Sequence, residues 1–141
     1  MIEKFSGKYR FLSNFYRASV IYEGIQYPSV EHAYQAAKTL SETERKFIKK
    51  LRKPVEAKRA GKKVRLRANW ESIKKQVMEE LVRDKFTRHA HLKVALLKTG
   101  DVELQEGNTW NDYFWGVDLK TKHGQNNLGK ILMKVRDELR K

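Results

Sequence analysis

The spacing of the apolar residues changes at Pro28-Ser29, and this change constrains the fold more than any other feature of the chain. Before it, aromatic and aliphatic residues alternate with polar ones, and a turn sequence at residues 22–25 separates two β-favouring runs. This pattern predicts a hairpin over about residues 18–28. Ser29 is a typical helix N-cap, so a helix is expected over about residues 30–39.

Capping signals and helical spacing predict the rest of the fold. Ser41 and Glu44 fit a capping box for a helix to about residue 51, and Pro54 and Gly61 bracket a short helix. Asn69 can cap a long helix over residues 70–88, and further helices are expected over about 91–98 and 126–139. Short strands are expected over residues 102–106 and 113–117. The predicted fold class is α+β: a helix-rich single domain over residues 1–141 with a small antiparallel sheet.

Length and composition exclude several classes of function. The chain has 141 residues and no cysteine, which fits one domain and rules out disulfides, thiolate zinc sites and cysteine nucleophiles. Its longest apolar runs, such as residues 94–97, fall far short of the roughly 20 residues that span a bilayer. The first residues lack the architecture of a signal peptide. A soluble cytoplasmic protein without membrane contact is therefore expected.

Metal, cofactor and nucleotide chemistry find little support in the sequence. Of the four histidines, only His89 and His91 are close together, and residues two apart do not share a helix face. The chain has no nucleophile elbow and no glycine-rich phosphate loop of the Walker type. We therefore expect no metal and no cofactor, and neither a serine triad nor turnover of nucleoside triphosphates.

Positive charge is concentrated in one segment. The net charge is +14, and residues 38–67 hold thirteen basic and three acidic residues, or +10 of that total. Such a segment attracts polyanions and phosphorylated ligands. A solvated basic surface without a binding role is equally consistent with the charge alone.

One helix face carries the best candidate for catalysis. Glu31, Gln35 and Lys38 are separated by four and three residues, so they project from one side of the helix expected over residues 30–39. A surface pair is the commoner outcome of this spacing. The aromatic residues around it, including Tyr34 and Phe15, favour instead an aromatic-rich site at the start of the helix.

Other residues are candidates for binding a base or a phosphate. Trp70 can stack on a base or fill the core, and Arg65 and Arg67 can grip a phosphate from an extended segment. Trp110 and Trp115 lie near a turn-rich stretch, and core filling is the better interpretation of Trp115. Lys130, in the first turn of the last helix, marks a second and weaker anion site.

Several blocks of sequence resemble one known family. They are FLSNFY at residues 11–16, YPSVEHAYQAAK at 27–38, VRLRANW at 64–70, the stretch 78–86, FWGV at 114–117 and NNLGKILMKVR at 126–136. In this order they resemble the YbiA-like, or NADAR (NAD- and ADP-ribose-associated), family over nearly the whole chain. Two departures are Asp118, where the family often has glycine, and Ala68-Asn69, where it commonly has Pro-Asp.

The resemblance implies a YbiA-type fold and an N-glycosidase that cleaves the bond between a ribose carbon and an amino group on a base. Two substrate classes belong to the family: ADP-ribose on guanine in DNA or RNA, and phosphoribosylamino-pyrimidine intermediates of riboflavin biosynthesis. The basic segment favours the first. A non-catalytic module that binds ADP-ribose or nucleic acid, and a nucleic-acid-associated structural protein, remain alternatives. An ADP-ribosyltransferase toxin is a candidate genetic partner.

Cleavage of a riboside C1–N bond needs a carboxylate near the sugar and a proton donor near the nitrogen. We predict Glu31 as that carboxylate, Asp112 as a second carboxylate that orients ribose or water, and Lys38 as proton donor, phosphate ligand or Schiff-base nucleophile. The predicted substrate-binding residues are Ser13, Asn14, Phe15, Gln35, Arg65, Arg67, Trp70, Trp110, Trp115 and Lys130.

Overall fold

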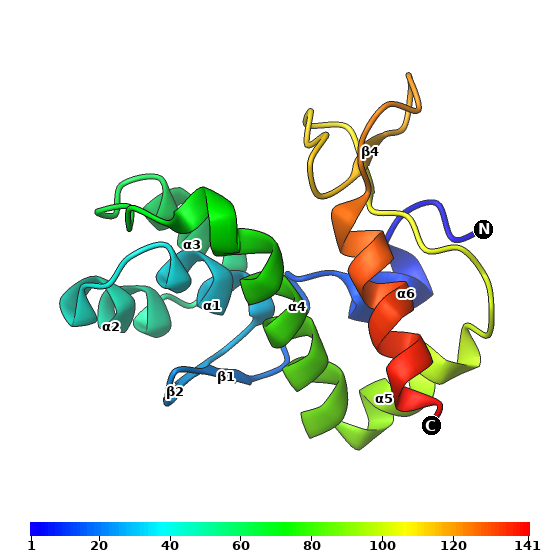
Figure 1. Cartoon of the computed structure of the whole chain (residues 1–141), viewed down its shortest axis with the longest axis horizontal. Coiled ribbons are helices and arrows are strands. Elements are labelled where there is room, and N and C mark those ends of the chain that lie inside the picture. The colour runs from blue at the N-terminus through cyan, green and yellow to red at the C-terminus, as the bar shows by residue number, and fades with distance from the viewer. The chain divides into compact units, whose positions relative to one another are not determined.

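The computed structural model describes residues 1–141, which form two compact units (Figure 1). The central unit comprises Asn14–Arg88, and the terminal unit comprises Met1–Ser13 together with His89–Lys141. The organisation of residues 1–141 as a single domain stays a prediction. No helix of the chain combines the length and the apolar character needed to cross a bilayer.

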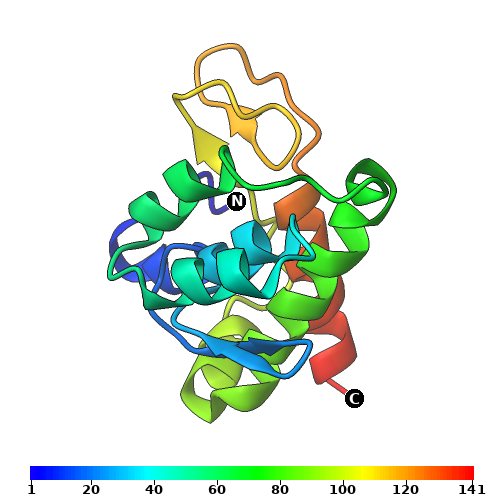
Figure 2. The ribbon, with the colours of Figure 1, turned by 90° about the vertical axis from the view of Figure 1, so that its left-hand side faces the viewer.

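The central unit opens with the predicted hairpin. Strands β1 (Val20–Tyr22) and β2 (Ile25–Tyr27) pair antiparallel, with Val20 opposite Tyr27 (Figure 2). Glu23 and Gly24 both have positive φ, at 46° and 83°, as a tight two-residue hairpin turn requires. The side chains of Val20 and Tyr27 are fully buried.

Four helices follow in the central unit: α1 (Val30–Ala37), α2 (Glu42–Lys50), α3 (Pro54–Gly61) and α4 (Trp70–Arg88). The predicted caps form at two of them. Ser29 Oγ accepts from the His32 amide at 3.1 Å, and Ser41 Oγ accepts from the Glu44 amide at 3.2 Å. Only half of the capping box exists at α2, because the Glu44 carboxylate accepts from Thr39 Oγ1 and from the Arg65 amide.

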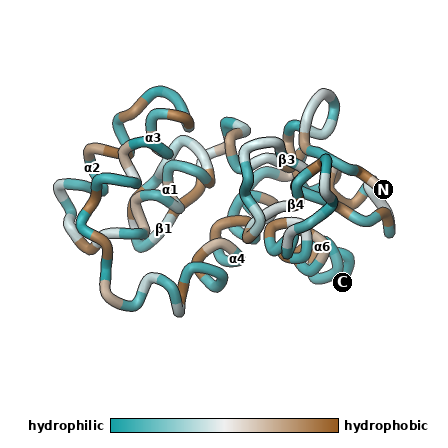
Figure 3. Tube along the Cα trace, turned by 90° about the horizontal axis from the view of Figure 1, so that it is seen from above, coloured by the Kyte–Doolittle hydropathy of each residue, from teal (hydrophilic) through white to brown (hydrophobic).

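Helix α1 is the centre of this unit. All eight of its residues are buried, and it packs against α2, α3 and α4. Its alanines, at positions 33, 36 and 37, have no exposed surface and so let the neighbouring helices approach closely. On α4 an apolar stripe faces inward, with Val77, Met78, Leu81, Val82 and Phe86 buried. By contrast, most of the α2 and α3 trace is hydrophilic (Figure 3).

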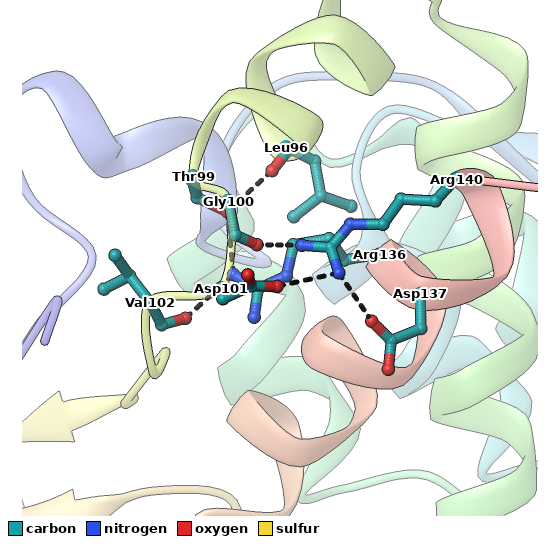
Figure 4. Close-up of polar contacts among 8 residues, drawn as sticks. All are labelled: Leu96, Thr99, Gly100, Asp101, Val102, Arg136, Asp137 and Arg140. Carbon is teal, nitrogen blue, oxygen red and sulfur yellow. Dashed lines mark hydrogen bonds and ion pairs between the residues drawn. The ribbon is translucent and has the colours of Figure 1, made fainter.

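The terminal unit contains a short 3₁₀ helix, η1 (Gly7–Leu12), and helices α5 (Ala90–Lys98) and α6 (Asn127–Leu139). Arg136 of α6 and Arg140, the residue after its end, bind the chain that follows α5 (Figure 4). Arg136 donates to Thr99 Oγ1 at 2.9 Å and to the Val102 carbonyl at 2.8 Å, and Arg140 pairs with Asp101 at 2.9 Å and Asp137 at 3.1 Å. These contacts hold the loop after α5 against α6.

The predicted strands of this unit are wrong. Residues 102–106 and 113–116 are not strands. Instead β3 (Gly107–Asn108) and β4 (Val117–Asp118) form a two-residue parallel pair, and Leu104 makes a single bridge to Ile2. The loop between β3 and β4 is stabilised by polar side chains bonded to the backbone, an alternative to strand pairing. The helix-rich α+β class, with one small antiparallel sheet at β1 and β2, is confirmed.

Candidate functional site

The N-terminus of α1 presents Glu31. Ser29 caps the helix, so Glu31 falls in the first turn, where the helix dipole favours a negative charge. The Glu31 amide donates to the Asn14 carbonyl at 3.1 Å, which ties the segment before β1 to the start of the helix. Glu31 is only 7% exposed, so its carboxylate lies in a largely desolvated environment.

Gln35 holds this carboxylate. Its Nε2 donates to Glu31 Oε2 at 2.7 Å, as the spacing of four residues on one helix face predicts. Gln35 is 5% exposed, and its Oε1 has no hydrogen-bond partner. The Gln35 amide thus orients this carboxyl group without adding a charge of its own.

Lys38 lies at the C-terminal end of α1 and interacts electrostatically with Glu31. Burial lowers the pKa of the Lys38 ammonium, the Glu31 carboxylate opposes this shift, and Lys74 reinforces it. The Nζ atom lies 5.7 Å from the centroid of the Tyr34 ring. Lys38 is therefore a half-buried lysine whose proton is held less tightly than usual, within electrostatic range of Glu31. Gln35 and Lys38 thus both interact with Glu31, and the roles of the three residues stay predictions.

His32, next to Glu31, has a structural role. Its Nδ1 accepts from the Ser29 hydroxyl at 2.7 Å, and its Nε2 donates to the Leu51 carbonyl at 2.9 Å. Burial lowers its pKa, which favours a neutral ring, and the Leu51 carbonyl, which can only accept, requires the proton on Nε2. No group of three or more histidine, aspartate or glutamate residues in the chain is arranged to hold a metal ion.

Trp70 is a core residue in this structure. It is 3% exposed, and its ring lies 5.2 Å from the Tyr34 ring at an interplanar angle of 57°. Of the two sequence interpretations, burial is the one observed, and contact with a substrate stays a prediction. Phe15 is 40% exposed, and the side chain of its neighbour Asn14 contacts Met78 Sδ at 3.4 Å.

The two arginines before α4 have different surroundings. Arg67 is half-buried, and its guanidinium donates to the Ala37 carbonyl at 3.4 Å and to Asn69 Oδ1 at 3.0 Å. Arg67 thus caps the C-terminus of α1, and the side-chain oxygen of Asn69, expected to cap α4, is bonded to this arginine. Arg65 is exposed, and its amide donates to the Glu44 carboxylate. Of the two, Arg65 is the freer candidate for a phosphate contact.

Five predicted site residues belong to the terminal unit: Ser13, Asp112, Trp110, Trp115 and Lys130. Asp112 Oδ1 accepts from the amides of Phe114 at 3.2 Å and Trp115 at 2.9 Å, so this carboxylate organises a turn. Trp115 is half-buried edge-on against Phe114, with ring centroids 4.7 Å apart. Trp110 is 59% exposed. The Ser13 amide donates to the Arg10 carbonyl and ends η1.

The anion site predicted at the start of α6 stays a prediction, and two backbone amides there are already engaged. The amides of Asn127 and Leu128 donate to the carbonyls of Phe114 at 3.2 Å and Trp115 at 3.0 Å. These first-turn donors would have to be free to hold an anion. The Lys130 side chain is exposed, and a phosphate contact through it stays a prediction.

Sequence reasoning missed two residues that shape these sites. Asn108 stabilises the loop between β3 and β4 in the terminal unit. Its Oδ1 accepts from the Asp112 amide at 3.0 Å, and its Nδ2 donates to the Asp112 carbonyl at 2.9 Å. Gly61, expected to follow its helix as a terminator, is its last residue and lies against Gln35. Only the turn-rich composition around Asn108 gave a signal, and the contact of Gly61 is formed across the fold.

Comparison with known proteins places the chain among N-glycosidase relatives. It is 41% identical over 136 residues to the N-glycosidase YbiA of Shigella flexneri serotype 5b, covering 95% of this chain and 84% of that protein. It is 40% identical over 131 residues to the riboflavin biosynthesis protein VVA0006 of Vibrio vulnificus, covering 92% of this chain but 35% of that larger protein.

A solved structure and a family model agree with these relatives. The NMR structure of the E. coli protein YbiA superposes with a TM-score of 0.85 at 37% identity, covering 99% of this chain and 87% of that one. The model of the NADAR domain matches residues 3–140. With the fold, the sequence blocks and the length of the match in agreement, the chain belongs to the NADAR domain family.

Proposed function

We propose that this chain is an N-glycosidase that hydrolyses the bond between a ribose C1 and an amino group on a base, and that its substrate is ADP-ribose attached to guanine in nucleic acid. The observation that carries the proposal is the buried Glu31 carboxylate, oriented by Gln35 at 2.7 Å in the first turn of α1. The N-glycosidase name of the Shigella relative supports the same reaction class.

The reaction requires charge stabilisation on the sugar side. As the C1–N bond breaks, its electron pair goes to the base nitrogen and positive charge develops on the ribose. A water oxygen bonds to C1, and the base leaves with a free amino group. Glu31 would take the proton of this water or stabilise the oxocarbenium-like ribose, because a desolvated carboxylate interacts strongly with developing positive charge.

Lys38 is suited to deliver the proton to the departing nitrogen. Burial lowers the pKa of its ammonium, which makes it a stronger acid than an exposed lysine. The same environment raises the fraction of neutral amine, which in the alternative mechanism attacks C1 of the ring-opened ribose and expels the base amine as the C1–N bond breaks. The resulting Schiff base on Lys38 is then hydrolysed by water, which releases the sugar. Borohydride added during turnover would leave a sugar adduct on Lys38 in the second case. An unmodified Lys38 peptide, with the protein still active, would favour the proton-donor role.

Two surface features support a nucleic-acid substrate. Most basic side chains of residues 38–67 are exposed, among them Lys46, Lys49 and Lys50 on α2 and Lys62 after α3. Exposed cations along a segment fit the repeated charge of a phosphate backbone. Trp110 adds an exposed ring of the kind that stacks on bases without regard to sequence.

A second candidate substrate is a phosphoribosylamino-pyrimidine intermediate of riboflavin biosynthesis. The Vibrio vulnificus relative, which carries that pathway in its name, favours it. This chain spans 35% of that protein, so the relative contains other segments as well. A small anionic ribose-amine needs the same carboxylate and proton donor, and the two candidates therefore share one mechanism.

One experiment tests the proposal. The purified protein is incubated with an ADP-ribosylated guanine oligonucleotide and, separately, with the phosphoribosylamino-uracil intermediate, and released sugar and base are measured by chromatography and mass spectrometry. Glu31→Gln should reduce turnover by about a hundredfold to ten-thousandfold and leave ligand binding nearly intact.

Glu42→Gln is the matched control, since it makes the same change in the first turn of α2 at an exposed carboxylate. Normal turnover by Glu31→Gln would remove Glu31 from the mechanism. Binding of both ligands without cleavage would favour the non-catalytic module, and strong salt-sensitive binding to unmodified nucleic acid alone would favour the structural protein.

A further inference from the structure

The last residue of α3 lies directly against the side chain of Gln35. A β-carbon added at Gly61 would lie 1.8 Å from Gln35 Oε1, 2.6 Å from its Cδ and 3.0 Å from its Cβ. The first two separations are shorter than any real contact of such an atom, so an alanine here would force Gln35 to move. Gly61 itself is buried.

The backbone of Gly61 does not require glycine. Its φ is not positive, unlike those of Gly7, Gly24, Gly100 and Gly124. Alanine fits a right-handed helical residue without strain and favours the helix more than glycine does. The position therefore needs glycine for space alone, and that space is occupied by the Gln35 amide.

The orientation of this amide follows from its two ends. A carboxylate only accepts hydrogen bonds, so the Nε2 end of Gln35 must face Glu31, which it meets at 2.7 Å. The Oε1 end then points to the α3 backbone at Gly61, where it has no hydrogen-bond partner. A rotated amide would place two oxygens together at Glu31, which is unfavourable.

We propose that Gly61 is a positioning residue that acts through Gln35 on the Glu31 carboxylate. This inference rests on the proposed function, because it assumes that Glu31 acts in the reaction. A β-carbon at position 61 displaces the Gln35 amide and breaks its hydrogen bond to Glu31, and the carboxylate loses one of the contacts that orient it. The helices need not separate for this to happen, because the displaced group is the end of a flexible side chain.

The test compares Gly61→Ala with the wild type in steady-state kinetics and in NMR of the Gln35 side-chain amide. We expect kcat to fall by about tenfold to a hundredfold, the usual effect of losing a hydrogen bond to a charged group. We expect KM to change by less than about threefold and the melting temperature not to fall. The Gln35 Nε2 resonances should shift and exchange faster with solvent.

A double-mutant cycle separates this role from general packing. In a Gln35→Ala background the added methyl group at position 61 meets no amide, so Gly61→Ala should change kcat by less than about twofold. Ala60→Gly is the matched control: it makes the reverse substitution at the neighbouring residue of α3 and should leave kcat unchanged, although it weakens the helix.

The outcomes distinguish this inference from the proposed function. Wild-type kcat in Gly61→Ala, or an equal loss of kcat in the Gln35→Ala background, would overturn the role of Gly61. If the wild type cleaves neither substrate, the proposed function fails and the catalytic role of Gly61 fails with it, and the NMR readout then tests only the contact between position 61 and the Gln35 amide. An unshifted Gln35 amide in Gly61→Ala would then refute it, and a shifted one would support the contact.

Discussion

Lys85 offers a quantitative test of the structure, because it is a cation with almost no access to water. It lies on α4, is 1% exposed, and has its Nζ 5.6 Å from the Tyr16 ring centroid and 5.0 Å from that of Phe86. Burial lowers the pKa of Lys85 from 10.5 to about 7. The folded protein therefore releases this proton near neutral pH, whereas the unfolded chain keeps it to about pH 10.5.

The sign and size of the effect follow from this difference. Between about pH 7 and pH 10.5 the unfolded chain binds more protons at this position than the folded protein, so the free energy of unfolding rises with pH over that interval. At about 1.4 kcal/mol for each pH unit, the interval corresponds to about 5 kcal/mol. The cost of burying Lys85 is largest below pH 7, where the folded protein holds it charged.

The substitution Lys85→Met isolates this contribution, since methionine fills a similar volume and does not titrate. Urea unfolding at pH 6 to pH 9 should show the variant to be more stable than the wild type at pH 6. The difference in the free energy of unfolding between the two proteins should be smaller by about 3 kcal/mol at pH 9. Lys75→Met, at an exposed position of the same helix, should show a gap that does not depend on pH. A constant gap for Lys85→Met would refute the reasoning.

Three further substitutions test local features of the two units. Ser29→Ala removes the cap of α1 and should lower the free energy of unfolding by about 1 to 2 kcal/mol, measured by thermal melting; an unchanged melting temperature would contradict the capping role. Asp112→Ala removes two backbone contacts, so hydrogen exchange at the Trp115 amide should quicken while that of α1 stays unchanged. Asn126→Gly keeps the positive φ of 54° but loses contacts to Leu104 and Glu106; urea unfolding should show a loss of about 1 to 3 kcal/mol, and no loss would show these contacts to be dispensable.

The helices were predictable because residues close to their ends in the sequence determine where they begin. Ser29 and Ser41 accept the backbone amides that a cap must satisfy, and Pro54 occupies the first turn of α3, where its missing amide costs nothing. The hairpin was predictable for the same reason. Its turn needs positive φ at both central positions, and the glycine at position 24 adopts positive φ without steric cost. These signals depend on neighbours within four residues.

The loop of the terminal unit was not predictable from alternation of apolar residues. Residues 113–117 are rich in aromatic side chains, which favour strands, but Asp112 and Asn108 bind the backbone amides and carbonyls that a strand would pair. The outcome is a compact turn that ends in the short pair of β3 and β4. A local polar contact prevails here over β propensity.

The candidate site was predictable in part. The shared face of Glu31, Gln35 and Lys38 follows from helical spacing. In the structure Gln35 donates a hydrogen bond to Glu31, and Lys38 interacts with the charge of Glu31. Sequence could not decide between burial and stacking for Trp70, since the answer depends on how Tyr34 of α1 packs against Trp70 of α4. It also could not predict that Gly61 on α3 leaves room for the Gln35 amide.

The choice of a glutamine beside Glu31 has a chemical consequence. An arginine at that position would orient the carboxylate more firmly, but it would also neutralise the charge that must stabilise an oxocarbenium-like ribose. An amide fixes one oxygen at 2.7 Å and adds no net charge. Its own free oxygen then needs a place without a polar clash, and the missing side chain of Gly61 provides one. The reactivity proposed for Glu31 thus depends on a glycine two helices away in the sequence, which explains why local sequence alone could not reveal it.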